Sequence, residues 1–259
     1  MTSTGRAPVT VVIAAHNEAA NIQACLASVS WAAEAIVVEN DSTDGTAFCA
    51  NEVGATVISP PFTTIGHARN AGIAMAAHPW VLVLDADERC SPELADELHE
   101  LAKGSHSFKA FRIPRRNFFL GREIKHGGWE RDRPLRFFPR TLRYDDKKVH
   151  EGVRVEGAVG ETHCSLLHYT YASLDAFFEK LSRYSRDWAE QNFAKGRRVG
   201  FWSVLLRGRL RFASMYLLKL GFLDGAHGLI LARLAEESVM AKYARLWEMT
   251  LAERAERVK

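Results

Sequence analysis

Residues 80–87 read Trp80-Val81-Leu82-Val83-Leu84-Asp85-Ala86-Asp87, an apolar run that ends in two acids separated by one alanine. Such a run predicts a buried strand. Acids at the end of a buried strand are costly unless a cation meets them. Strand alternation would direct Asp85 and Asp87 to one side of the backbone and Ala86 to the other. Two carboxylates that point one way suit Mg²⁺ or Mn²⁺ bound together with substrate phosphates, whereas a pair of solvated loop acids is the simpler alternative.

The chain before this stretch alternates strands with helices. Apolar and β-branched runs predict strands at residues 9–15, 35–38, 55–58 and 81–84. Helical spacing of apolar residues predicts helices at residues 19–31 and 66–77. This rhythm is typical of an α/β fold with a doubly wound, mostly parallel sheet, in which ligands bind at the carboxyl ends of the strands. We therefore expect the polar residues that follow the strands to gather at one edge of the sheet.

Four polar motifs accompany these elements. They are His16-Asn17-Glu18, Glu39-Asn40-Asp41-Ser42-Thr43-Asp44-Gly45-Thr46, Gly66-His67-Ala68-Arg69-Asn70 and Leu84-Asp85-Ala86-Asp87-Glu88. Their order and spacing resemble those of the family-2 glycosyltransferases. The resemblance implies a GT-A fold, which is a Rossmann-like sheet with flanking helices. It also implies a nucleotide-sugar donor, a divalent metal ion and inversion at the anomeric carbon of the transferred sugar.

The resemblance also implies roles for single residues. The residues that it assigns to the donor are His16, Asn17, Glu18, Glu39, Asp41, Arg69, Asp85 and Ala86. Asp87 and Asp85 would hold Mg²⁺ or Mn²⁺. Arg69 suits the donor phosphates because a guanidinium binds phosphate bidentately, although a surface ion pair is the alternative. For Asn17 and Asp44, simple capping of a helix is an equally good explanation.

Residues 103–143 are basic and aromatic, which indicates the acceptor-binding half of the same domain. An inverting transfer needs one carboxylate that takes the proton of the acceptor hydroxyl. In the resembled family this base precedes an arginine-bearing apolar segment, so Asp132 is the expected base and Glu130 the alternative. The alternative is that Asp132 has only a structural role, in an ion pair with Arg131 or Arg136. The expected acceptor contacts are Trp129, Arg115, Arg116 and Arg136.

The second half of the chain is similar to one branch of the family, the bacterial lipopolysaccharide core β-glucosyltransferases. The motifs that carry this similarity are residues 113–121, His126-Gly127-Gly128-Trp129, Val149-His150-Glu151, Leu167-His168-Tyr169 and Gly221-Phe222-Leu223-Asp224-Gly225. His150 would complete the metal shell or contact the diphosphate. The similarity implies UDP-glucose as donor and a lipopolysaccharide core or related lipid-linked glycan as acceptor. It also implies work at the cytoplasmic face of the inner membrane.

The C-terminal region combines basic and apolar residues. An amphipathic helix is predicted at residues 174–193, and residues 191–223 contain seven Lys or Arg and no acid. Aromatic and leucine side chains among arginines are typical of a helix that lies in the plane of an anionic membrane surface. A hairpin packed on the catalytic domain, or on a second subunit of a homo-oligomer, is the alternative. The segment is too leucine-rich for a nucleic-acid groove, so we expect no nucleic-acid partner.

The bulk composition sets limits on the other classes of protein. The chain has 259 residues, a net charge of +3 and 47% hydrophobic residues, which is ordinary for a globular protein. We expect a domain at residues 8–172, divided into 8–100 and 101–172, and a helical appendage at 173–259. Neither a signal peptide nor a membrane-spanning run is predicted. The four cysteines are widely spaced, which favours reduced thiols over zinc or disulfides.

Two other functions are compatible with such a core. A nucleotidyltransferase would need a glycine-rich, basic loop after the first strand, and residues 14–18 contain neither glycine nor Lys/Arg. A membrane-peripheral scaffold with a degenerate transferase core would not need Asp85, Asp87 and Asp132 to be intact. The sequence therefore favours an enzyme, a glycosyltransferase.

Overall fold

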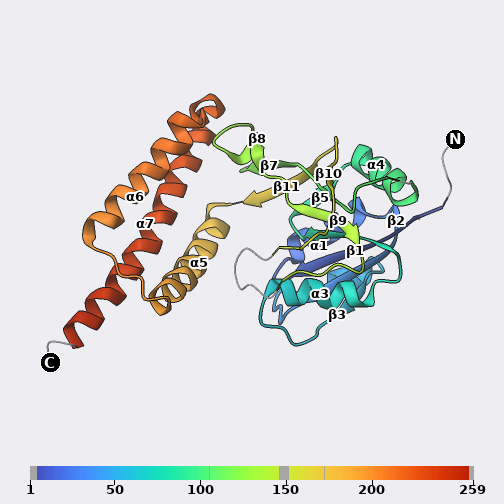
Figure 1. The fold of residues 1–259 in the computed structure, drawn as a ribbon, viewed down its shortest axis with the longest axis horizontal. Helices are drawn as coiled ribbons and strands as arrows, with labels where there is room; N and C mark the ends of the chain where they lie inside the picture. Colours follow the sequence, from blue (N-terminus) through green and yellow to red (C-terminus); the bar gives the residue numbers. More distant parts are fainter. Residues whose placement is uncertain (1–4, 105, 146–151, 172, 257–259) are drawn as a thin grey trace. The chain divides into compact units, whose positions relative to one another are not determined.

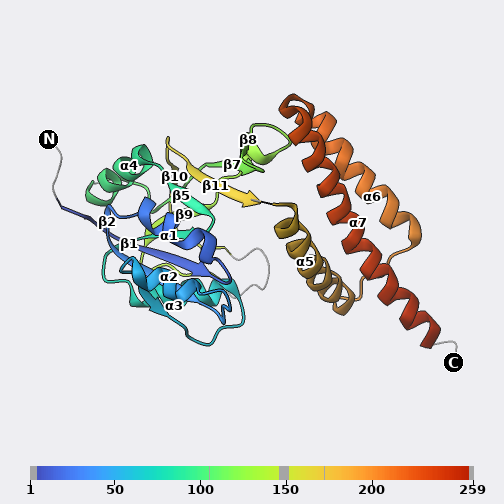
Figure 2. The same ribbon diagram turned by 180° about the vertical axis from the view of Figure 1, so that it is seen from behind.

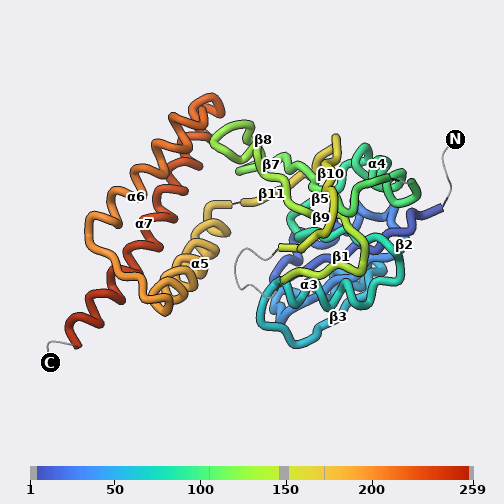
Figure 3. The backbone as a smooth tube through the Cα atoms, viewed as in Figure 1, coloured from blue at the N-terminus to red at the C-terminus, as the bar shows by residue number. Residues whose placement is uncertain are grey.

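The structure is a computed structural model that describes residues 5–104, 106–145, 152–171 and 173–256. The chain divides into two compact units, which are drawn in Figure 1. The first unit comprises Met1–Arg116 and Arg131–His168, and the second comprises Asn117–Glu130 and Tyr169–Lys259. The chain therefore leaves the first unit after Arg116, returns at Arg131 and leaves again after His168; Figure 3 draws its path as a tube.

A seven-stranded sheet forms the centre of the first unit. Its strands are β1 (Ala7–Ala15), β2 (Ala32–Glu39), β3 (Thr56–Ile58), β4 (Trp80–Asp85), β6 (Ala110–Arg112), β9 (Leu135–Pro139) and β10 (Val159–Glu161). Their order is β10-β6-β9-β4-β1-β2-β3, and only β9 runs antiparallel to its neighbours. The predicted α/β class with a mostly parallel sheet is confirmed.

Helices cover both faces of this sheet because its central strands are apolar on both sides. Val11 and Ile13 of β1 pack with α1 (Ala19–Ser28), α2 (Thr46–Glu52) and α4 (Pro92–Lys103). Val12 points to the opposite face and packs with α3 (Ile65–Met75). The approach of α3 is close, since a Cβ on Gly72 would lie 2.5 Å from the Val12 side chain.

Two expected boundaries shift in the structure. The helix expected at residues 19–31 ends at Ser28, because Ala32 already begins β2 and the Trp31 carbonyl accepts a hydrogen bond from the Ala7 amide. Ala86 and Asp87 form a turn between β4 and the short strand β5 (Glu88–Cys90). The strand alternation that was expected to align Asp85 with Asp87 therefore ends at Asp85.

The second unit is built on three long helices. They are α5 (Leu174–Ala194), α6 (Phe201–Ala213) and α7 (Gly225–Glu256), and α5 and α6 both run along α7 in Figures 1 and 2. The α6–α7 contact is tight, because a Cβ on Gly208 would lie 2.5 Å from the Met240 side chain. A π-helical turn (Ser214–Leu218) and a 3₁₀ turn (Gly221–Asp224) join these two helices.

A hairpin completes this unit and explains why residues 117–130 group with the helices. The last residues of β7 (Arg115–Phe119) pair with β8 (Arg122–Ile124) across Leu120 and Gly121, which both have positive φ, as a two-residue hairpin loop requires. Phe119 and Ile124 are buried with Phe177 in the core of the unit. No single described helix meets the length and hydropathy expected of a bilayer span; residues 201–218 and 221–256 meet them only as a pair, across a 73° bend.

Candidate active site

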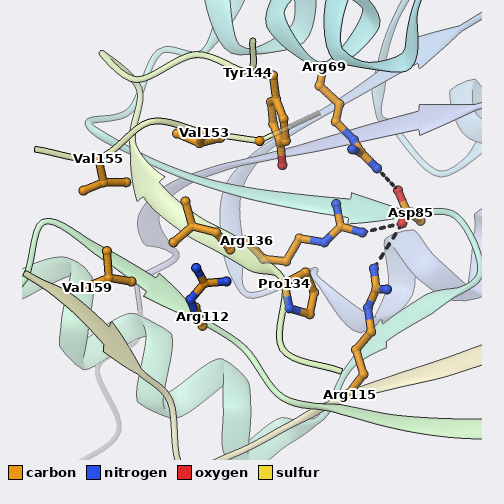
Figure 4. A pocket seen from close by; sticks show the side chains of 12 residues that line it. Arg69, Asp85, Arg112, Arg115, Pro134, Arg136, Tyr144, Val153, Val155 and Val159 are labelled. Carbon is orange, nitrogen blue, oxygen red and sulfur yellow. Dashed lines mark hydrogen bonds and ion pairs between the residues drawn. The ribbon is translucent and has the colours of Figure 1, made fainter. Parts of the chain in front are cut away.

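The carboxylate of Asp85, the last residue of β4, is held by three arginines from three elements. Arg69 of α3 donates to Oδ1 at 2.5 Å, Arg115 donates to Oδ2 at 3.2 Å, and Arg136 of β9 also donates to Oδ2. Figure 4 shows the three guanidinium groups converging on this carboxylate. Burial alone would raise the pKa of Asp85, but the three positive charges hold that pKa well below its usual range.

A second carboxylate, Glu88, is fully buried beside this cluster. Its Oε1 lies 2.6 Å from Nε of Arg115, and its Oε2 lies 3.3 Å from Arg136 and accepts the Asp85 amide at 2.7 Å. A buried carboxylate is stable only with such partners, so Glu88 fixes the positions of Arg115 and Arg136. Sequence patterns alone assign Glu88 no role, although it directly follows Asp87.

Asp132, the predicted base, joins the same network through Arg115. Its Oδ2 lies 3.1 Å from Nη1 of Arg115, and its carbonyl oxygen accepts the Arg115 amide at 3.0 Å. The structural alternative to the base role paired Asp132 with Arg131 or Arg136, whereas the ion pair in the structure is with Arg115. The Asp132 side chain is 39% exposed, which leaves it accessible to a ligand. Arg115 therefore links Asp132, Asp85 and Glu88.

A cavity of about 680 Å³ opens beside this network. Its charged lining consists of Arg69, Arg112, Arg115, Arg136 and Asp85. Its other lining residues are Pro134, Leu135, Tyr144, Gly152, Val153, Val155 and Val159, and Figure 4 shows most of them around the same space. Four guanidinium groups and one carboxylate line the cavity, and Glu88 and Asp132 neutralise part of the positive charge from behind.

Tyr144 lies under Arg69 on one wall of the cavity. The Arg69 guanidinium is 5.1 Å from the centre of the Tyr144 ring. Asn70, the neighbour of Arg69 on α3, fixes the Tyr144 backbone with two hydrogen bonds, of 2.9 and 3.0 Å. The Arg69-Asn70 pair of the sequence motif thus has two tasks, since one residue holds Asp85 and the other holds Tyr144.

Asp87 lies beside a histidine. Its Oδ1 lies 3.6 Å from Nε2 of His168 on β11 (Leu166–Tyr171), and both side chains are 13% exposed. His168 reaches this position because its strand pairs with β5 at Glu88. Across the described part of the chain, no group of three His, Cys, Asp or Glu side chains could hold a metal ion. His150, the predicted third ligand, lies outside the described residues.

Asp87 and His168 nevertheless suit a divalent ion that needs few protein ligands. Mg²⁺ and Mn²⁺ are commonly held by one or two protein ligands, with substrate phosphates completing the shell. Asp87 and His168 offer an oxygen and a nitrogen side by side. Both carboxylate oxygens of Asp85 accept hydrogen bonds from arginines, and a metal ion would have to share them. The metal-ligand role of Asp85 stays a prediction.

The loops after β1 and β2, which contain predicted donor residues, are tied to each other. Asn17 and Asp41 both have positive φ (54° and 47°), which is unusual outside glycine. The Asn17 side-chain oxygen accepts the Thr43 amide at 2.8 Å, and the backbone amide of Asn17 donates to Ser42 Oγ at 3.0 Å. These contacts give Asn17 a structural role in shaping the loops.

Carboxylates reinforce this arrangement. Glu39 accepts from the Ser42 amide and from Ser59 Oγ at 3.1 Å; burial would raise its pKa, but these bonds hold it below its ordinary value. Asp44 accepts the first amide of α1 and the Thr46 amide of α2, so the capping explanation holds for it. His16 is exposed beside them and donates through Nδ1 to the Asn40 carbonyl. Glu18 accepts from Asn21 at 2.8 Å.

The remaining predicted residues lie elsewhere in their units. Ala86 is buried in the core of the sheet. Arg116 is exposed and its charge acts on Glu93. Trp129 and Glu130 belong to the second unit, where the Trp129 carbonyl accepts from Asn117 and the Glu130 carboxylate accepts the Gly128 amide, both at close to 3 Å. The structure therefore brings together Asp85, Arg69, Arg115, Arg136 and Asp132 from the predicted set.

Residues 10–157, more than half of the chain, match the family described as "Glycosyl transferase family 2". The chain belongs to glycosyl transferase family 2. This membership confirms the predicted enzyme class and disfavours both the nucleotidyltransferase and the scaffold alternatives. The matched residues include the whole cluster: Asp85, Asp87, Asp132, Arg69, Arg115 and Arg136.

Whole-length relatives of this glycosyltransferase are distant. The lipopolysaccharide core biosynthesis glycosyltransferase LpsC of Rhizobium meliloti is 28% identical over 92% of this chain and 93% of its own. An uncharacterized glycosyltransferase of Rickettsia typhi is 24% identical over 95% of this chain and 89% of its own. Among solved structures, the glucosyl-3-phosphoglycerate synthase of Mycobacterium tuberculosis with Mn²⁺ and UDP shares 26% identity and a TM-score of 0.37. That match covers 43% of this chain and less than half, 45%, of the synthase.

Proposed function

We propose that this glycosyltransferase moves a hexose, with UDP-glucose as the first candidate donor, to a lipopolysaccharide core or a related lipid-linked envelope glycan. Two facts support the proposal. The chain is a family-2 glycosyltransferase, and its similarity to LpsC, which is named for lipopolysaccharide core biosynthesis, extends over nearly the whole of both chains.

The observation that carries the proposal is the Asp87–His168 pair, in which Asp87 directly follows the carboxyl end of β4, the neighbour of β1 in the sheet. Asp87 and His168 would hold Mg²⁺ or Mn²⁺, which supplies positive charge to the departing diphosphate when it is bound. The tied loops at His16, Asn17 and Glu39 would bind the nucleoside on the same edge. Asp85, clamped by its arginines, would position the transferred sugar and the donor phosphates.

Asp132 is the group that we propose as the base. The acceptor hydroxyl oxygen forms a bond to the anomeric carbon while the bond from that carbon to the diphosphate oxygen breaks. Asp132 takes the hydroxyl proton, and Arg115 keeps its carboxylate in position at 3.1 Å. The exposure of Asp132 agrees with this role because an acceptor must reach it. Glu130 remains the alternative base.

The second unit would bring the enzyme to a lipid-linked acceptor. Apolar side chains at the α6–α7 turn are exposed, from 44% for Phe222 to 81% for Leu218. The others are Leu217, Leu220 and Leu223, with Trp202, Leu206 and Leu210 along α6. Arg207, Arg211 and Lys219 are exposed among them. We name these residues the apolar–basic surface, and its charge is complementary to anionic lipid at the cytoplasmic face of the inner membrane.

Calorimetric titration of UDP-glucose, with and without Mn²⁺, tests the donor site. Mn²⁺ should tighten binding to the wild-type protein, and Asp87→Asn should abolish that gain while leaving the fold intact. Asp132→Asn should bind the donor normally and lose transfer to a core-oligosaccharide acceptor. Asp96→Asn, which changes an exposed acid on α4, is the matched control. An unchanged Mn²⁺ effect in Asp87→Asn would remove Asp87 from the site.

A further inference from the structure

The 680 Å³ cavity lies on the far side of β4 from the loops that we assign to the nucleoside. Sheet order sets β1 and β2, with His16 and Glu39 at their ends, on one side of β4. The cavity is lined from β6, β9 and β10 on the other side. A separate, smaller cavity of about 220 Å³, next to His16 and Asn40, lies at the β1 end. Asp85 on β4 therefore divides the edge into a donor side and a second, arginine-lined side.

The arginine-lined side carries more positive charge than its carboxylates neutralise. Arg69, Arg115 and Arg136 are paired with Asp85, Glu88 and Asp132. Arg112, the fourth arginine of the cavity, donates to the Arg133 carbonyl at 3.2 Å, and no carboxylate in the described ranges pairs with it. The network is thus left with one excess cation, and that cation lines the cavity.

Two buried polar atoms at the cavity also have bonding capacity that no described residue uses. The Tyr144 hydroxyl is buried and has no hydrogen-bond partner among the described residues, and the whole residue is only 6% exposed. Nε of Arg136 is likewise buried without a hydrogen-bond partner in the described ranges, in a residue that is 3% exposed. Figure 4 shows the Tyr144 hydroxyl directed toward the Arg136 side chain. A buried donor without a partner costs stability, so its presence beside an arginine-lined space points to a ligand that accepts from it.

We propose that this cavity binds a phosphate monoester carried by the acceptor sugar. Guanidinium groups bind phosphate oxygens bidentately, and a phosphate offers enough acceptors for Arg112, Arg136 and the Tyr144 hydroxyl together. The apolar wall of Leu135, Val153 and Val155 suits the carbon face of a sugar ring. The proposal rests on the proposed function, because it names the acceptor class of that same transferase site.

Direct binding to the whole protein tests this proposal, with glucose 6-phosphate as the probe and glucose and glucuronate as comparison ligands. Glucose 6-phosphate should bind, and glucose should not. Arg112→Gln should weaken glucose 6-phosphate binding about tenfold, the scale of a lost charge-assisted hydrogen bond. UDP-glucose binding with Mn²⁺ should stay unchanged in that variant. Glucuronate binding as tight as glucose 6-phosphate would overturn the phosphate class.

Tyr144→Phe adds a readout that a merely structural role would not give. Because the hydroxyl has no described partner, its removal should raise or preserve the melting temperature while weakening glucose 6-phosphate binding severalfold. A lower melting temperature with unchanged affinity would overturn the assignment. Displacement of glucose 6-phosphate by UDP would also overturn it, since the cavity would then belong to the donor. If the wild-type protein does not bind UDP-glucose at all, the proposed function itself is contradicted.

Discussion

Arginine side chains in the two units have opposite surroundings. In the first unit the side chains of Arg69, Arg115 and Arg136 are 7%, 12% and 4% exposed, and each contacts at least one carboxylate. In the second unit Arg207 and Arg211 are exposed among exposed leucines, and Arg209, although 3.3 Å from Glu236, keeps 72% of its side chain exposed. Buried arginines are fixed by short-range pairing, whereas exposed ones act on a partner through a screened field. The first group shapes a site, and the second group suits a surface.

The largest effect that tests this contrast is on stability. Arg136→Met should lower the free energy of unfolding by about 3–5 kcal/mol, because it removes a cation from the buried Glu88 and from Asp85. Arg211→Met, the matched change at an exposed site, should stay within about 0.5 kcal/mol. Urea denaturation followed by circular dichroism measures both. Similar losses in the two variants would contradict the contrast.

Local sequence pattern was enough to predict the sheet and part of the cluster. The apolar run before Asp85 and the alternation of strand with helix predict β4 and its neighbours, since both follow from short-range periodicity. Asp85 and Arg69 were expected at one sheet edge, and they meet there; Asp132, the expected base, is linked to Asp85 through Arg115.

The rest depends on contacts between distant segments, which periodicity does not encode. Tyr144 lines the cavity because Asn70, 74 residues away, holds its backbone. His168 reaches Asp87 because β11 pairs with β5, a strand of three residues that has no sequence pattern of its own. The pairing of Asp85 with three arginines was likewise not predictable, because those arginines are distant in the sequence. The sequence does not tell whether such a carboxylate binds arginines or a metal ion.

Acid should affect the buried cluster next most strongly. The pKa of Asp85 is depressed in the folded protein, so its contribution to stability is complete above the unfolded pKa, about 3.9, and is lost as the pH falls through the folded value. Each unit of depression corresponds to about 1.4 kcal/mol. The unfolding free energy of the wild type should therefore fall more steeply below about pH 4 than that of Asp85→Asn.

The exposed regions supply the control for that experiment. Asp187→Asn changes an exposed aspartate of α5, in the second unit, and its pH profile should parallel the wild type. If Asp85→Asn also parallels the wild type, the three arginines do not stabilise the charged form of Asp85, and the difference between buried and exposed pairs disappears.

The smallest effect concerns the exposed side of the comparison and its partner. Leu218→Ser should weaken binding to phosphatidylglycerol vesicles about fivefold, since partial burial of a leucine contributes about 1 kcal/mol. Arg211→Gln should weaken binding by a similar factor in low salt only, because one basic residue near an anionic surface contributes about 1 kcal/mol and is screened by salt. Phe48→Ser removes an apolar side chain of the first unit that is 68% exposed, and it should not change vesicle binding. Vesicle sedimentation measures all three. If Leu218→Ser instead dissociates a dimer in the absence of lipid, the apolar–basic surface faces a second copy of the chain, and its arginines would then need acidic partners there.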